Sequence, residues 1–108
     1  MKKIVVMVSG SGSNLQAIID SCNRKHIDAE ITCVISNNPR AYGLERAASA
    51  NINSIVINHK DYKSRDCYDS ELMKALDNLN PDLSVLAGFM RILTEKLTSK
   101  FFGKIICI

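Results

Sequence analysis

The chain has 108 residues, of which 46% are hydrophobic and 23% are charged, and its formal net charge is +3. These values are ordinary for one compact globular domain, and the scattered lysines and arginines do not indicate a nucleic-acid surface. No apolar run approaches the roughly 20 residues that span a bilayer, and no signal-peptide pattern precedes the first predicted strand. We therefore expect a cytoplasmic protein with neither a nucleic-acid nor a membrane partner.

The first predicted element is a buried strand that ends in a glycine-serine loop. Residues 4–8 are apolar and mostly β-branched, which is typical of a strand buried on both faces in a parallel sheet. Residues 9–13 read Ser-Gly-Ser-Gly-Ser, and a helical pattern begins at Asn14. The free N–H groups and positive dipole end of such a helix favour a phosphate-bearing ligand in the loop. The alternative is a tight turn that only joins strand and helix.

Strands and helices then alternate along the chain. We expect further strands at 31–35, 54–57, 83–87 and 105–108, and helices at 14–24, 42–50, 65–79 and 94–99. Ser64 is a good N-cap for the helix 65–79, on which Cys67 is expected to face the core. The alternation predicts an α/β fold: a Rossmann-like, doubly wound, mainly parallel sheet with helices on both faces. The loops at 9–14, 37–39 and 88–91 should then meet at one edge of the sheet.

The last predicted strand is apolar and contains the final residue, Ile108. A domain seldom ends within a buried strand without a covering element. We therefore expect a fragment, or the product of a truncated gene, that is cut in the fifth strand. Its uncovered apolar surface predicts a partner, either a separate C-terminal half or a second copy of the chain.

The glycine pattern narrows the class of phosphate ligand. Gly10-x-Gly12 begins like a dinucleotide fingerprint, but Leu15 stands where the third glycine belongs, and no P-loop lysine follows. Arg40 would suit the 2′-phosphate of NADP, so an NADP-binding module stays open. The short, hydroxyl-rich loop suits a phosphate monoester better than a pyrophosphate.

Few other polar residues stand out as candidates for chemistry. Arg65 begins a predicted helix, where it would either reach a ligand carboxylate or phosphate or pair with Asp69 four residues later. His26 and His59 have no neighbour that suggests catalysis, and we expect both at the surface. The four cysteines form no CxxC pair and have no histidine at ligand spacing, so neither a metal site nor a disulfide framework is predicted.

The loop after the strand 83–87 carries a second candidate site. Arg91 follows a buried strand directly, in a position where loops often carry function. Met90, Ile92 and Leu93 beside it would form either an apolar wall for a flat ring or part of the core.

Three segments together resemble one enzyme family. They are SGSGSNLQAII at 9–19, SNNPRAYGLERA at 36–47 and LAGFMRIL at 86–93. In combination they resemble the N-terminal half of the phosphoribosylglycinamide formyltransferases of purine synthesis, and the likeness runs over essentially all 108 residues. The resemblance implies a single N-terminal part of a formyltransferase domain at 1–108. It also implies a metal-free transfer of a formyl group from 10-formyltetrahydrofolate to the amine of 5-phosphoribosylglycinamide. Formyltransferases that act on formyl-methionyl-tRNA or on other amines share the scaffold, but the modest charge and the SGSGSN loop favour the small phosphorylated substrate.

The same resemblance implies the site residues. It implies that Gly12, Ser13 and Asn14 bind the substrate phosphate. It also implies that the folate is contacted by Arg65, Met90, Arg91, Ile92 and Leu93. The family uses an Asn-x-His motif at the end of the fifth strand and a later Asp. The asparagine stabilises the oxyanion, the histidine is the general acid, and the aspartate orients it. Cys107 stands at the asparagine position, and the chain holds neither the histidine nor the aspartate. We therefore expect the chain to be inactive alone.

Overall fold

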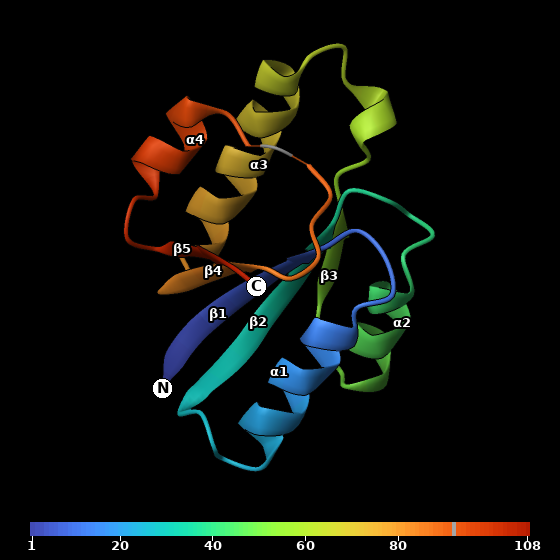
Figure 1. Ribbon diagram of the computed structural model, residues 1–108, viewed down its shortest axis with the longest axis vertical. Coiled ribbons are helices and arrows are strands. Elements are labelled where there is room, and N and C mark those ends of the chain that lie inside the picture. Colours follow the sequence, from blue (N-terminus) through green and yellow to red (C-terminus); the bar gives the residue numbers. More distant parts are fainter. Residues whose placement is uncertain (92) are drawn as a thin grey trace.

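The computed structural model describes residues 1–91 and 93–108. One sheet holds β1 (Lys2–Val8), β2 (Ala29–Ser36), β3 (Ser54–Val56), β4 (Leu83–Leu86) and β5 (Ile105–Cys107). The helices are α1 (Ser13–Asn23), α2 (Tyr42–Ser49), α3 (Arg65–Leu79) and α4 (Glu95–Lys100), with a short 3₁₀ helix η1 (His59–Asp61). All neighbouring strands are parallel, in the order β3-β2-β1-β4-β5 (Figure 1). The predicted Rossmann-like fold is confirmed.

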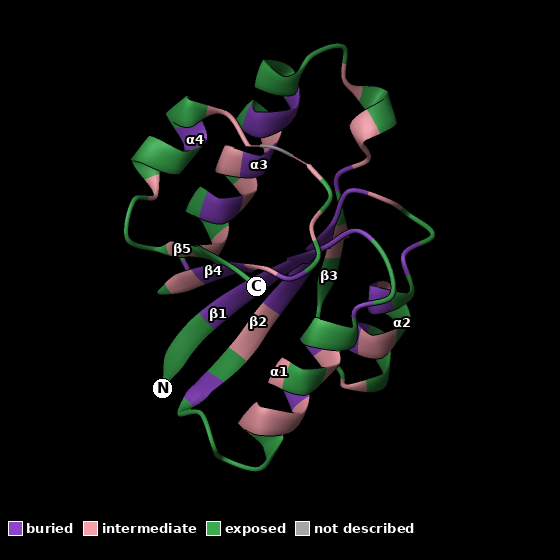
Figure 2. Cartoon of the chain, in the orientation of Figure 1, coloured by how far each residue is buried: buried purple, intermediate pink, exposed green. Residues whose placement is uncertain are grey.

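The central strand β1 organises the core. Its residues from Ile4 to Val8 are all buried, between β2 on one side and β4 on the other (Figure 2). Val6 and its neighbours of the same parity pack with α1 and α2, whereas Val5 and Met7 pack with α3 and α4. Because helices cover both faces of the sheet, the strand needs no polar alternation.

The long helix α3 begins and ends where the sequence predicts, but near its start a different residue faces the core. Ser64 Oγ caps it by accepting the Cys67 N–H at 3.1 Å. Its buried face runs through Tyr68, Leu72 and Leu76, each 0% exposed, at a spacing of four residues. Cys67 lies one position off this stripe and is exposed, so the prediction that it faces the core is wrong.

The strand order reverses between β1 and β4. The chain runs outward from β1 through β2 to β3, then returns to place β4 and β5 on the other side of β1. The loops that follow β1 and β4 therefore leave the sheet side by side, at the position where α/β folds of this kind bind ligands. None of the helices in the described residues is long and apolar enough to cross a membrane.

Candidate functional site

The loop after β1 opens into the N-terminus of α1. Gly12 precedes the helix in a left-handed conformation, with φ 73° and ψ 27°, and its carbonyl accepts the Gln16 N–H at 2.8 Å. No side chain of the described residues caps this end of the helix, so its first N–H groups are left to a ligand or solvent. The loop lines a cavity of about 260 Å³, which we call the first cavity. Its walls are Ser9, Gly10, Ser11, Gly12, Ser13, Asn14, Ala87, Gly88 and Met90.

Helix α2 donates two hydrogen bonds to backbone carbonyls of this loop. The Gly43 N–H donates to the Gly10 carbonyl at 3.0 Å, and Arg46 Nε donates to the Ser11 carbonyl at 2.7 Å. A Cβ placed on Gly12 would lie 2.8 Å from the Gly43 Cα. The two backbones are therefore so close that a side chain at position 12 would clash, and only glycine fits there. Sequence reasoning assigned no role to Gly43 or Arg46. The pattern that carries them, SNNPRAYGLERA, gave no sign that α2 returns to the loop.

A second cavity of about 300 Å³ lies beside the first. It is lined by Ser9, Asn37, Asn38, His59, Met90 and Arg91. The three loops expected at one edge of the sheet therefore do meet there, because the carboxyl ends of β1, β2 and β4 lie together. His59 is half-buried, and its Nδ1 lies 3.0 Å from the Asn37 carbonyl. His59 is thus only partly exposed, whereas His26 is exposed as predicted.

Arg91 leaves the loop toward α3. Its guanidinium lies 4.5 Å from the centroid of the Tyr68 ring, and its Nε is buried without a hydrogen-bond partner in the described part of the chain. The residue after Tyr68 is Asp69, whose Oδ2 accepts the Thr94 N–H at 2.6 Å. Asp69 therefore braces the chain after the loop. No Asp69–Arg65 ion pair forms among the described residues.

The other predicted folate residues occupy different surroundings. Met90 is 82% exposed beside both cavities, whereas Leu93 packs into the core with α3 and α4. Arg65 is exposed at the first turn of α3 and lines neither cavity. Cys107 is exposed at the end of β5. The predicted residue Ile92 lies outside the described residues.

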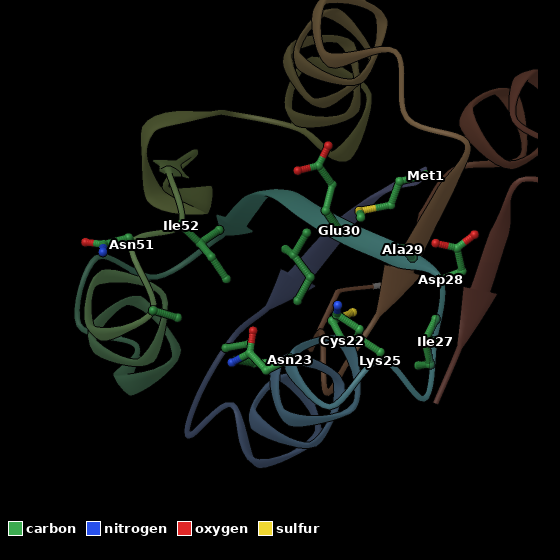
Figure 3. Close-up of a pocket in the computed structure, with 13 residues that line it drawn as sticks. Met1, Cys22, Asn23, Lys25, Ile27, Asp28, Ala29, Glu30, Asn51 and Ile52 are labelled. Carbon is green, nitrogen blue, oxygen red and sulfur yellow. The ribbon is translucent and has the colours of Figure 1, made fainter.

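A third cavity, larger than these two, lies elsewhere. A cavity of about 680 Å³ opens at the opposite edge of the sheet, where β2 begins and α1 ends (Figure 3). Met1, Cys22, Ile27 and Ile52 line it together with charged residues such as Lys25, and it contains none of the predicted site residues. Among the described residues, no three histidine, cysteine, aspartate or glutamate side chains gather as a metal site requires.

Tyr68 gives the site's surroundings a testable pH dependence. Burial raises the pKa of Tyr68 to about 12, with Arg91 opposing the shift, against about 10 in an unfolded chain. The folded state thus favours the protonated phenol. The free energy of unfolding should therefore fall by about 2–3 kcal/mol as the pH rises from ~10 through 12, because the folded state keeps the proton that the unfolded state loses. Urea unfolding at pH 9 and pH 11 should show a steeper loss of stability in the wild type than in Tyr68→Phe. Equal losses in the two proteins would contradict this assignment.

The fold and the loop together identify the class of domain. A doubly wound sheet with a glycine-serine loop at its switch point and an uncapped helix N-terminus defines a Rossmann-like domain, and such helix N-termini are frequent anion-binding positions. The chain belongs to the formyl transferase family, whose pattern matches residues 2–108.

Several phosphoribosylglycinamide formyltransferases are similar to this chain in sequence and in structure. The phosphoribosylglycinamide formyltransferase of Haemophilus influenzae is 49% identical over 108 residues, which are 100% of this chain and 51% of that protein. The Escherichia coli protein of the same name is 46% identical over 105 residues, 97% of this chain and 50% of the relative. The crystal structure of glycinamide ribonucleotide transformylase 1 from Symbiobacterium toebii superposes with a TM-score of 0.93 at 38% identity. That superposition covers 99% of this chain and 50% of the other. The chain thus spans about half the length of these relatives.

Proposed function

We propose that residues 1–108 form the N-terminal part of a phosphoribosylglycinamide formyltransferase domain and bind the phosphate of 5-phosphoribosylglycinamide in the first cavity. The observation that carries the proposal is the uncapped N-terminus of α1, which opens into that cavity through Gly12, Ser13 and Asn14. A phosphate monoester would accept the free N–H groups and interact favourably with the helix dipole. The named relatives support the choice of this ribonucleotide.

The folate donor, 10-formyltetrahydrofolate, would lie along Met90 and Arg91. The exposed Met90 side chain offers an apolar face to a flat ring, and Arg91 offers a cation in the adjacent second cavity. Arg65, Ile92 and Leu93 complete the assignment by family resemblance. Leu93 would then act from the core side, by supporting the loop.

The chemistry of formyl transfer needs groups that residues 1–108 do not supply. A tetrahedral intermediate requires an oxyanion donor and a general acid. Cys107, at the position of the donor, offers only a weak S–H, and loss of such a donor costs on the order of 10²–10³ in rate. We therefore propose that this 108-residue chain binds ligands without turning them over. Formyl transfer above a reagent blank would contradict this part of the proposal.

A charge placed at Asn14 tests the phosphate site. Asn14 is exposed at the first turn of α1, so Asn14→Asp should raise the free energy of unfolding by about 0.3–1 kcal/mol through the helix dipole. The same carboxylate should repel a bound phosphate and weaken ribose 5-phosphate binding about tenfold or more. Isothermal titration calorimetry, together with amide shifts at Gly12 and Ser13, measures the binding. Ribose without phosphate is the ligand control.

Asn23→Asp provides the matched protein control. It makes the same substitution at the other end of the same helix, where the residue is also exposed. Its binding of ribose 5-phosphate should match the wild type. If Asn14→Asp also binds as the wild type does, or if ribose binds as well as its phosphate, the first cavity is not a phosphate site.

A further inference from the structure

Ser9 stands between the two cavities. It is the residue that follows β1, it is 9% exposed, and together with Met90 it lines both the first and the second cavity. Its Oγ accepts the Met90 N–H at 2.7 Å, across 81 positions of the sequence. Ser9 and Met90 therefore form a shared wall, which joins the glycine-serine loop to the loop after β4.

This hydrogen bond holds the backbone at Met90, whose own side chain is exposed, between Phe89, which packs against the core, and Arg91, which lies over the Tyr68 ring. The Ala87 N–H still donates to the Met7 carbonyl as part of the sheet, and the Thr94 N–H donates to Asp69. Between these two anchors, Gly88 turns the chain with φ +68°, and the Met90 side chain is 82% exposed. The position of Met90 thus depends on its backbone, and Ser9 supplies the acceptor that its N–H uses.

We propose that Ser9 is a positioning residue that sets Met90 and Arg91 against the glycine-serine loop and thereby couples binding in the two cavities. This inference rests on the proposed function. A ligand that moves or fixes the shared wall from one side acts on the other side as well, and such coupling is reciprocal. A phosphate ester in the first cavity should therefore strengthen folate binding at the second, and folate should strengthen phosphate binding by the same factor.

Loss of the Ser9 hydroxyl should weaken folate binding and remove the coupling. A partly buried N–H without its acceptor costs enough to lower affinity about 5- to 30-fold where binding needs the loop in place. In the wild type, saturating ribose 5-phosphate should tighten 10-formyltetrahydrofolate binding about fivefold. In Ser9→Ala the factor should fall to within about twofold of unity, below the roughly fivefold lower end of typical coupling effects. Ser9→Thr, which keeps a hydroxyl, should restore it.

The experiment compares these variants in the 108-residue chain by calorimetry, with and without each ligand, and by amide hydrogen exchange at Met90. Ser70→Ala, an exposed serine on α3, is the matched control. If Ser9→Ala fails to fold, Ser9→Cys decides, since a thiol keeps the volume but accepts hydrogen bonds poorly. Faster exchange at Met90 with weaker, uncoupled folate binding supports the proposal. Unchanged exchange at Met90 overturns the proposal. Faster exchange with unchanged folate affinity and coupling also overturns it, because the hydrogen bond would then only stabilise the loop.

Different outcomes would contradict the proposed function and the role of Ser9. If the wild type binds neither ribose 5-phosphate nor folate, the proposed function fails and no coupling exists for Ser9 to carry. If the wild type binds both ligands but independently of each other, the proposed function stands and the inference is overturned.

Discussion

Replacing Gly12 by alanine is expected to lower the free energy of unfolding by about 2–4 kcal/mol and to abolish measurable binding of ribose 5-phosphate. Two costs add at this position. The backbone at φ +73° is left-handed, where a Cβ is strained, and that Cβ would lie 2.8 Å from the Gly43 Cα. Gly43 cannot retreat freely, because its N–H is bound to the Gly10 carbonyl at 3.0 Å. Urea unfolding and calorimetry measure the two effects.

Two other glycines separate the causes. Gly103 has φ +80° but open space around it, so Gly103→Ala should show the strain alone, about 1–2 kcal/mol. Gly10 has open space and no left-handed φ, so Gly10→Ala should change stability by less than about 0.5 kcal/mol. If Gly12→Ala costs no more than Gly103→Ala, the close approach of α2 to the loop is not a constraint.

Replacing Tyr68 by alanine is expected to remove about 3–4 kcal/mol of stability, a large share of what a domain of this size has. Its ring is 0% exposed, packs edge-on against Tyr62 at 5.6 Å between centroids, and lies under the Arg91 guanidinium. Its hydroxyl is buried without a hydrogen-bond partner in the described residues. Tyr68→Phe should therefore be neutral or stabilising by up to about 1 kcal/mol at pH 7.

Tyr42 is the matched control for the tyrosine–arginine contact. Arg46 lies 4.9 Å from the centroid of its ring, much as Arg91 lies over Tyr68, but the Tyr42 side chain is 58% exposed. Tyr42→Ala should cost only about 0.5–1 kcal/mol. Thermal unfolding of the two alanine variants distinguishes burial from the cation–π contact. Equal costs would show that burial is not the larger contribution of Tyr68.

Local sequence patterns predicted most of the fold because the relevant interactions are local. The unbroken apolar run at residues 4–8 identified a strand covered on both faces, and Ser64 marked the start of α3 through a hydrogen bond three residues away. The alternation of strands and helices, together with the right-handed crossover rule, left little choice of topology. The loop of Gly12 to Asn14 followed from the strand and helix on either side of it.

The missed features depend on contacts between distant segments. Cys67 and Tyr68 are neighbours on one helix turn, and only the packing of α3 on the sheet decides which one is buried. His59 became half-buried because the loop after β2 offers it the Asn37 carbonyl. Leu93, for which the sequence left wall and core open, lies against the core because α3 and α4 pack together there.

By itself, the sequence determined the class of fold, the glycine-serine loop as the candidate anion site, and the likeness to formyl transferases, since each is visible in stretches of consecutive residues. The tertiary structure decided how that loop is supported. Arg46 reaches the Ser11 carbonyl, Gly43 admits the Gly12 backbone, and Ser9 holds Met90 across 81 positions of the sequence. Such contacts leave no local periodicity, because the residues come together only when parallel strands bring the ends of β1 and β4 side by side.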